Sequence, residues 1–123
     1  MISVGRLFRV ILYVHDMQRM VEFYRDVLRL PLSAPRAKAD YSDEYWVEFA
    51  AGSCAIVLHG GGQKRLGADT PKLAFRVADI ESTRDTLILR GARMGEIRSP
   101  APGVRVADGC DPEGHPFSID CHN

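Results

Sequence analysis

The sequence predicts an α+β fold in which two βαβββ modules follow one another along a chain of 123 residues. Two observations support this prediction. A segment with strand character leads into a helical segment twice, and an aspartate stands between them each time. The two starts also align, with Arg9 against Lys72 and Asp16 against Asp79, which keeps the same side-chain parity in both strands. One module would leave a sheet face exposed, so we expect two to form a shared, cup-shaped mixed sheet with the helices outside.

The first module is expected over about residues 6–59. Residues 7–14 are rich in β-branched and aromatic side chains, which predicts a strand. Asp16 is a suitable N-cap for a helix over residues 17–28, where apolar residues recur at helical spacing. Pro31 is expected to end this helix.

Three further segments complete the first module. Residues 33–44 are polar and without periodicity, which predicts a loop. Residues 45–51 and 53–59 have strand character, and Gly52 between them predicts a turn. Residues 60–71 are rich in glycine and charge, and are expected to form a linker.

The second module is expected over about residues 72–122. A strand at 72–80 ends in Asp79, and a helix follows that Gly91 closes. Three short strands are then predicted, within ARMGEI, VRVADG and PFSIDCH. Pro100, Pro102 and Gly103 separate the first two of these strands, and the DPEGHP segment forms a turn before the last.

The composition excludes several classes of partner. Lys and Arg number 16, as do Asp and Glu, so the formal net charge is zero, whereas nucleic-acid binding needs a basic excess. No apolar run approaches the roughly 20 residues that cross a bilayer, and no secretory signal is evident. Cys54, Cys110 and Cys121 form no C-x-x-C pair, as expected for reduced thiols. We therefore expect a cytoplasmic protein with no nucleic-acid or membrane partner.

Three motifs resemble one known family. They are RVILYVHDMQRMVEFYRDVLRLPL near the start, LAFRVADIE at mid-chain and DPEGHPFSI near the end. Together they are similar to the vicinal oxygen chelate superfamily, also called the glyoxalase / bleomycin-resistance / extradiol dioxygenase fold. The resemblance implies a single domain with paired βαβββ modules, a cup-shaped site and a homodimer. It leaves the chemistry open, because the superfamily includes metalloenzymes and metal-free binding proteins.

The resemblance also implies where a metal would be bound. Metal-dependent members have His or Gln on the first strand of each module, seven residues before the capping aspartate; Arg9 and Lys72 stand there in this sequence. The two remaining ligand positions correspond to Val57 and Ser118. Two cations, an alkyl group and a hydroxyl do not form a divalent-metal site. We therefore expect no metal and no other cofactor.

Strand parity predicts which side chains face the helices and which face the cup. The residues expected to face the helices as core are Phe8, Val10, Leu12, Val14, Leu73, Phe75, Val77, Phe117, Ile119 and Cys121. The candidate ligand-binding residues in the cup are Arg9, Tyr13, Trp46, Glu48, His59, Lys72, Arg76, Ser118 and Asp120, beside the apolar Ile11, Val57 and Ala74. Cys54 has core parity, Cys110 is expected in an exposed turn, and His115 is expected to fix a turn.

Two cations are expected to be neighbours in the cup. Arg9 and Lys72 repel each other unless an anionic group joins them, and either Glu48 or an anionic ligand could do so. Trp46 and Tyr13 could stack on a flat ligand or pack within the protein. The leading hypothesis is thus a metal-free protein that binds a small aromatic or anionic compound, with a role in sequestration or resistance.

Two other hypotheses remain open. The first is a lyase, isomerase or dioxygenase with a displaced divalent-metal site around His59, Asp120 and His122, or a metal-free enzyme in which Glu48 is the general base beside Arg9 and Lys72. The second is a regulatory subunit whose cup is filled by its own side chains.

Overall fold

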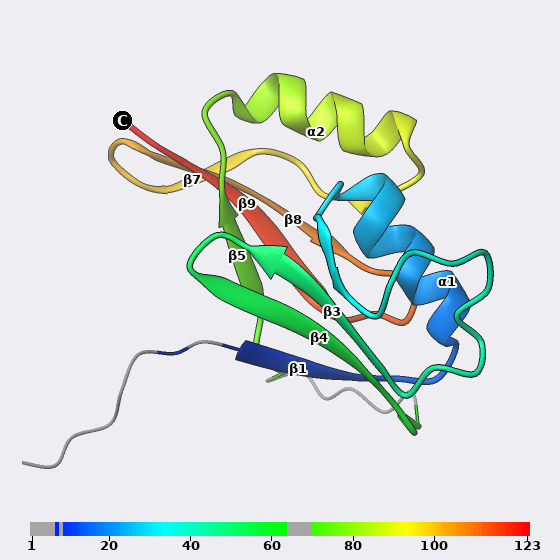
Figure 1. Cartoon of the computed structure of the whole chain (residues 1–123). Coiled ribbons are helices and arrows are strands. Elements are labelled where there is room, and N and C mark those ends of the chain that lie inside the picture. The colour runs from blue at the N-terminus through cyan, green and yellow to red at the C-terminus, as the bar shows by residue number, and fades with distance from the viewer. Residues whose placement is uncertain (1–6, 8, 64–69) are drawn as a thin grey trace, which may run out of the picture. The chain divides into compact units, whose positions relative to one another are not determined.

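A computed structural model of the chain describes residue 7, residues 9–63 and residues 70–123 (Figure 1). The chain divides into two units, Met1–Gln63 and Lys64–Asn123. Each unit contains one mixed sheet with its own helical segment, which agrees with the predicted α+β class. The part of the predicted linker at residues 64–69 lies outside the described residues.

The sheet of the first unit has the strand order β1-β4-β3-β2. Strand β1 pairs with β4 in parallel, and the other two pairings are antiparallel. The elements of this unit are β1 (Arg9–Val14), α1 (Met17–Glu22), the π-helix η1 (Phe23–Val27), β2 (Leu32–Ala34), β3 (Trp46–Ala51) and β4 (Cys54–Gly60). The predicted strands at 7–14, 45–51 and 53–59 are confirmed within one or two residues at their ends.

Two predictions for the first unit need correction. The predicted helix is present, but its second half is a π-helix, and Arg29 ends it in a left-handed conformation with φ 59° before Pro31 is reached. Strand β2 extends into the start of the loop predicted at residues 33–44, and it pairs with β3 through Leu32 and Phe49. A short edge strand needs only backbone pairing, so a polar sequence without alternation gives no signal for it.

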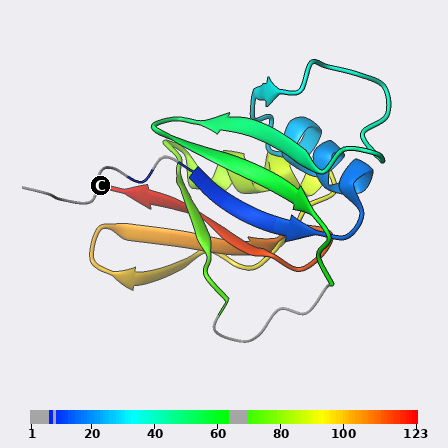
Figure 2. The same cartoon turned by 60° about the horizontal axis from the view of Figure 1, so that its bottom comes forward.

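The sheet of the second unit has the strand order β5-β9-β8-β6, and β7 pairs with β8. Its elements are β5 (Leu73–Arg76), α2 (Ile80–Leu89), β6 (Arg93–Met94), β7 (Arg98–Ala101), β8 (Val104–Cys110) and β9 (Pro116–His122). Helix α2 contacts β6, β8 and β9, and the strands β8 and β9 run side by side in both views (Figures 1 and 2).

Strand β7 was missed by the sequence prediction. Pro100 was expected to separate two strands, yet it lies within β7. Every residue of β7 is exposed and pairing is to β8 alone, so a proline is tolerated at this edge. Arg98 pairs with Val106 and Ala101 with Val104, with an irregular register between them.

The aspartates that define the repeat have the same structural role in both units. Asp16 Oδ1 accepts a hydrogen bond from the Arg19 amide at 3.1 Å, and Asp79 Oδ1 accepts one from the Ser82 amide at 3.0 Å. Each aspartate thereby satisfies an amide at the start of its helix, which confirms the predicted N-caps. Gly91, with φ 97°, follows the second helix as predicted.

The predicted strand parity agrees with the burial pattern for most residues, although Val57 and Ser118, which were expected to face the cup, are fully buried. Val14, Phe117 and Ile119 are buried, whereas Ile11 and Tyr13 on the opposite face of β1 are 40% and 59% exposed. The other predicted core residues that the structure describes are half-buried: Val10, Leu12, Leu73, Phe75, Val77 and Cys121. Phe8 lies outside the described residues.

The three cysteines are free thiols. Cys54 is half-buried and lies on the same side of β4 as Ile56 and Leu58, in line with its predicted parity. Cys110 is not in an exposed turn as expected, because it is the last residue of β8 and is half-buried.

Among the described residues, neither helix reaches the length and apolarity that a bilayer span would require.

Candidate functional site

One face of the first sheet carries a set of aromatic and charged side chains. The register aligns Tyr13 of β1 and Trp46 of β3 with His59 of β4, from either side. Glu48 is likewise opposite Val57 on the same face. We call this set the aromatic face; its members are Arg9, Ile11, Tyr13, Tyr45, Trp46, Glu48, Val57 and His59.

Three aromatic rings surround the His59 imidazole. The ring centroid of Tyr13 is 4.9 Å from that of His59, Trp46 is at 6.0 Å and Tyr45 at 6.1 Å. The Tyr45 and Trp46 rings meet the imidazole edge-on, with interplanar angles of 89° and 72°. This geometry is favourable for aromatic pairs, and it holds the imidazole at the centre of the cluster.

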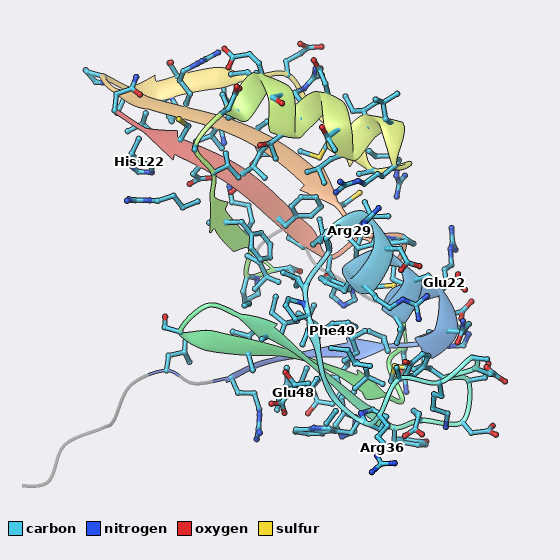
Figure 3. All side chains as sticks on the ribbon, turned by 45° about the horizontal axis from the view of Figure 1, so that its top comes forward. Glu22, Arg29, Arg36, Glu48, Phe49 and His122 are labelled. Carbon is cyan, nitrogen blue, oxygen red and sulfur yellow. The ribbon has the colours of Figure 1, made fainter. Side chains whose placement is uncertain are left out.

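Arg9 extends across the aromatic face. Its Nη2 atom lies 3.1 Å from Glu48 Oε1, and its guanidinium carbon lies 5.0 Å from the centroid of the Trp46 ring. Glu48 was one of the two anionic partners considered for Arg9 and Lys72; it pairs with Arg9, whereas Lys72 pairs with Asp108. Glu48 and Phe49 lie on opposite faces of β3 (Figure 3), so the carboxylate points to the aromatic face while Phe49 is fully buried. The face thus offers a cation that is stacked on an aromatic ring.

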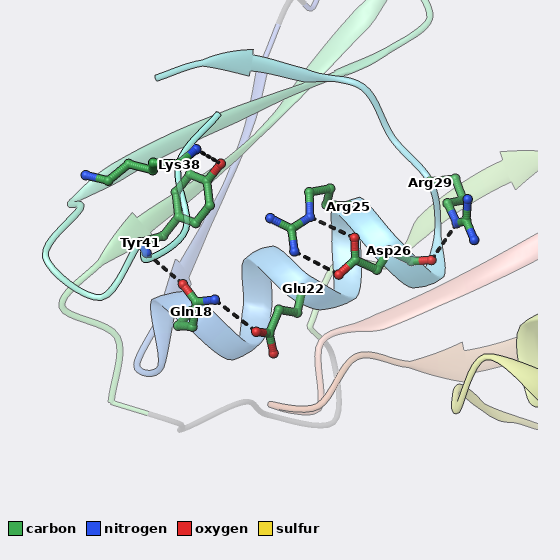
Figure 4. A network of polar contacts seen from close by, with 7 residues as sticks. All are labelled: Gln18, Glu22, Arg25, Asp26, Arg29, Lys38 and Tyr41. Carbon is green, nitrogen blue, oxygen red and sulfur yellow. Dashed lines mark hydrogen bonds and ion pairs between the residues drawn. The ribbon is translucent and has the colours of Figure 1, made fainter. Parts of the chain in front are cut away.

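A hydrogen-bonded loop leads into the strand that carries Trp46. Tyr41 is fully buried; its amide donates to Gln18 Oε1 of α1 at 2.6 Å, and its hydroxyl accepts from the Lys38 amide at 3.0 Å (Figure 4). The Tyr45 carbonyl then accepts a hydrogen bond from the Gly60 amide at 3.0 Å. These bonds fix the main chain on both sides of Tyr45 and so hold its ring beside His59.

A shallow depression of about 330 Å³ lies next to the aromatic face. Tyr45 lines this depression and also contacts His59, so the two features are adjacent. The other lining residues are His15, Met17, Ser42, Asp43, Glu44, Gly60 and Gly61.

The second sheet carries a different set, which we call the charged face: Lys72, Arg76, Arg98, Asp108, Ser118 and Asp120. Lys72 Nζ and Arg98 Nη2 each lie 3.0 Å from an oxygen of Asp108. Ser118 is fully buried, and its hydroxyl donates to Asp120 Oδ1 at 2.7 Å. Arg76 is opposite Asp120 in the register. Most charges on this face therefore have a partner within it.

The charge pairing on the second face affects the acidity of Asp108. Partial burial by itself would raise the pKa of this carboxyl group. The hydrogen bonds from Lys72 and Arg98 outweigh burial, and the pKa lies below the ordinary aspartate value. Asp108 is therefore a stable anion at neutral pH, and it neutralises part of the local positive charge.

The side chains at the four positions that correspond to metal ligands in metal-dependent members of the superfamily cannot bind a metal ion. Arg9 is paired with Glu48 and Lys72 with Asp108, while Val57 and Ser118 are fully buried. Neither an ammonium nor a guanidinium group has a lone pair for a metal. Within residues 7, 9–63 and 70–123, no group of three or more His, Cys, Asp or Glu is placed to hold a metal ion. His59 belongs to the first unit, and Asp120 and His122 belong to the second.

The DPEGHP segment forms the turn between β8 and β9, as predicted. Asp111 is fully buried; its Oδ1 accepts hydrogen bonds from the amides of Glu113 and His115, both at 2.9 Å. His115 Nδ1 lies 2.7 Å from Asp111 Oδ2. The prediction that His115 fixes a turn is confirmed, and the structure adds Asp111 as the residue to which the turn is anchored.

Sequence reasoning missed Tyr45 and Asp108. Tyr45 was included in the strand predicted over residues 45–51, where parity placed it on the face opposite Trp46; β3 begins only at Trp46, so parity does not decide the direction of Tyr45. Asp108 is in a strand whose apolar residues stand on both faces, which made its direction ambiguous. The proximity of Arg9 to Lys72 stays a prediction, since the two residues belong to different units.

Comparisons with known proteins identify similar chains. The model of the Glyoxalase-like domain matches residues 9–119. The uncharacterized protein YraH of Bacillus subtilis (strain 168) is 28% identical over 95 residues, which are 72% of this chain and 74% of YraH.

Two solved structures illustrate the range of similar proteins. TnmS3, an antibiotic binding protein from Streptomyces sp. CB03234, has a TM-score of 0.79 at 17% identity, with 100% of both chains covered. A lactoylglutathione lyase from Agrobacterium tumefaciens has a TM-score of 0.75 at 16% identity, with 97% of this chain and 95% of that chain covered. At these identities the likeness shows the fold alone, and the two proteins have different functions.

Proposed function

Because the chain belongs to the glyoxalase-like domain family, within the vicinal oxygen chelate superfamily, we propose that it is a metal-free small-molecule-binding protein of this superfamily. The ligand is a small aromatic compound with an anionic group, and the role is sequestration or resistance. The observation that carries the proposal is the aromatic face, where Arg9 is stacked on Trp46 beside the ring cluster around His59.

The chemistry of the aromatic face supports this ligand class. Tyr13, Tyr45 and Trp46 are 59%, 68% and 37% exposed, so their rings are available to a flat ligand. A ligand carboxylate would compete with Glu48 for the Arg9 guanidinium, which binds carboxylates through paired N–H groups. We expect the charged face, with Lys72, Arg76, Ser118 and Asp120, to contribute less to ligand binding, because its charges are largely paired with one another.

The sequestration role has support from one relative of similar fold. TnmS3 is described as an antibiotic binding protein. The zero net charge of the present chain opposes a strongly cationic ligand and is compatible with an anionic one.

We also propose a cytoplasmic homodimer in which residues 1–123 form a single domain, with modules at about 6–59 and 72–122. Sedimentation equilibrium of the full chain at micromolar concentration tests the dimer. A molecular mass of two chains is expected, and a monomer over the whole concentration range would refute it.

One experiment tests the binding function and its main alternative together. The protein is equilibrated with zinc, nickel, manganese and ferrous iron, dialysed and analysed for metal. It is then titrated with 2-naphthoate while the indole N–H resonance of Trp46, the single tryptophan, is followed by NMR. We expect less than about a tenth of an equivalent of each metal and a saturable shift of that resonance.

Two results would contradict the proposal. Retention of about one metal per chain would favour the enzyme with a displaced site, and His59, Asp120 and His122 would then be substituted first. An unchanged Trp46 resonance at millimolar concentrations of both 2-naphthoate and 6-hydroxy-2-naphthoate would exclude the aromatic face as a site for aromatic anions.

A further inference from the structure

One nitrogen of the His59 ring is already in use. Nδ1 lies 2.6 Å from the carbonyl oxygen of Gly60, which can only accept a hydrogen bond. Nδ1 therefore carries the hydrogen, and in the neutral ring Nε2 holds a lone pair and can only accept. The hydrogen bond that the structure gives for the His59 ring is thus made by Nδ1, and it leaves the Nε2 lone pair to accept from a ligand.

The surroundings of His59 keep this acceptor in place. The rings of Tyr13, Tyr45 and Trp46 contact the imidazole from β1 and from the start of β3. The Gly60 carbonyl that holds Nδ1 belongs to the same strand, so the imidazole is fixed at one edge by the main chain. Nε2 is the ring nitrogen farther from the main chain, and the His59 side chain is half-buried. The result is an acceptor on a half-buried side chain, bordered by aromatic surface.

We propose that His59 Nε2 is the specificity-determining acceptor for a hydroxylated aromatic acid, or for an aromatic acid with a ring N–H. This inference rests on the proposed function and specifies its ligand. The ring of the ligand lies against the aromatic face, its O–H or N–H donates to Nε2, and its carboxylate meets Arg9. A ring without a donor would cover Nε2 and leave the acceptor without a partner, which weakens binding.

Three matched compounds test the inference: 6-hydroxy-2-naphthoate, 6-methoxy-2-naphthoate and 2-naphthoate. All three have the same ring and carboxylate, and only the first has a donor. The methoxy compound is larger than the hydroxy compound and 2-naphthoate is smaller, so the pair controls for size. Calorimetric titration is expected to show that the hydroxy compound binds about five- to tenfold more tightly than either of the others.

Two variants assign the preference to His59. His59→Phe keeps an aromatic ring in the cluster but removes the acceptor, so the three compounds should bind with similar affinity. His59→Gln has a side-chain carbonyl oxygen that can accept, and it should restore part of the preference. Thermal unfolding of each variant is measured first, and a cooperative transition shows that the fold is retained.

The outcomes separate the inference from the proposed function. Equal binding of all three compounds by the unaltered protein, or a preference that survives in His59→Phe, would overturn the role of Nε2 and leave the proposed function intact. Binding of none of the three at millimolar concentration would overturn the proposed function, and the inference with it.

Discussion

The two units have the same order of strand, capping aspartate, helix and strands, but their sheet faces differ in chemistry. In the first unit, Tyr13 and Trp46 flank His59, and one ion pair joins Arg9 to Glu48. In the second unit the corresponding face has polar pairs, with Lys72 and Arg98 both on Asp108. The repeat thus specifies the backbone through apolar parity and caps. The side chains at the alternate positions of each strand differ between the two units. The aromatic side chains of the first unit are the ones suited to bind a flat ligand.

The largest expected effect on stability comes from a substitution in one of the two turns that join antiparallel strands. The turn between β3 and β4 is short and contains Gly52 at φ 74°, whereas the turn between β8 and β9 depends on the buried Asp111. Asp111→Ala removes the acceptor for two amides and the neighbour of His115. We expect a loss of about 2–4 kcal/mol in the free energy of unfolding, measured by urea denaturation.

Two further variants make that result interpretable. Asp111→Asn keeps an oxygen for the amides and loses the charge, so its loss should be smaller. Asp85→Asn, on the exposed side of α2, should change stability by less than about 0.5 kcal/mol. If Asp111→Ala were no more destabilising than Asp85→Asn, the turn would not depend on its carboxylate.

The second prediction compares the two faces directly. Trp46→Leu removes the ring that stacks on Arg9 and borders His59, so 2-naphthoate should bind about tenfold more weakly by calorimetry. Arg98→Gln changes the charged face and should alter the same affinity by less than about twofold. The reverse order of effects would assign the ligand to the second unit.

The third prediction concerns the ends of the two helical segments. Arg29 follows the first one at φ 59°, and Gly91 follows the second at φ 97°. A Cβ at Gly91 would meet no atom within 4 Å, so Gly91→Ala costs only the backbone strain, about 1 kcal/mol. Arg29→Gly should gain about 0.5 kcal/mol, although it loses the hydrogen bond from Arg29 Nε to the Asp26 carbonyl. Thermal unfolding of both variants checks that the two substitutions change stability in opposite directions. A destabilised Arg29→Gly would show that losing this hydrogen bond outweighs the relief of backbone strain.

Most of the fold could be predicted because it rests on local, repeated signals. Strand parity and the caps Asp16 and Asp79 are visible in the sequence, and the structure confirms them. Strands β2 and β7 could not be predicted in this way. Both are sheet edges that rely on backbone pairing, and neither has an alternating apolar pattern.

The site was predictable in part for a related reason. Parity placed Tyr13, Trp46 and His59 on one face, as the register shows. Tyr45 could not be placed, because its position depends on the loop that Tyr41 and Gln18 fix through a tertiary hydrogen bond. The hydrogen bond from His59 Nδ1 to the Gly60 carbonyl depends on the side-chain conformation, which no sequence pattern encodes.

The smallest expected effect is a pH dependence of stability that arises from Asp108 in the second unit. The pKa of Asp108 is lowered in the folded protein, where hydrogen bonds from Lys72 and Arg98 outweigh the effect of burial. A lowered pKa means that the ionised carboxylate stabilises the fold. This contribution is complete above the unfolded value, near pH 4, and is lost as the pH falls through the folded value.

Asp108→Asn tests this contribution. Because the side chain of Asp108 is 46% exposed, screening by solvent limits the expected loss at pH 7 to about 0.5 kcal/mol. Urea denaturation from pH 7 to pH 2 should show the two proteins converging in stability below about pH 4. A constant difference across that range would mean that Asp108 acts through its shape and neutral hydrogen bonds. The charged face would then resemble the aromatic face in depending on packing, and the contrast between the two units would lie in residue type alone.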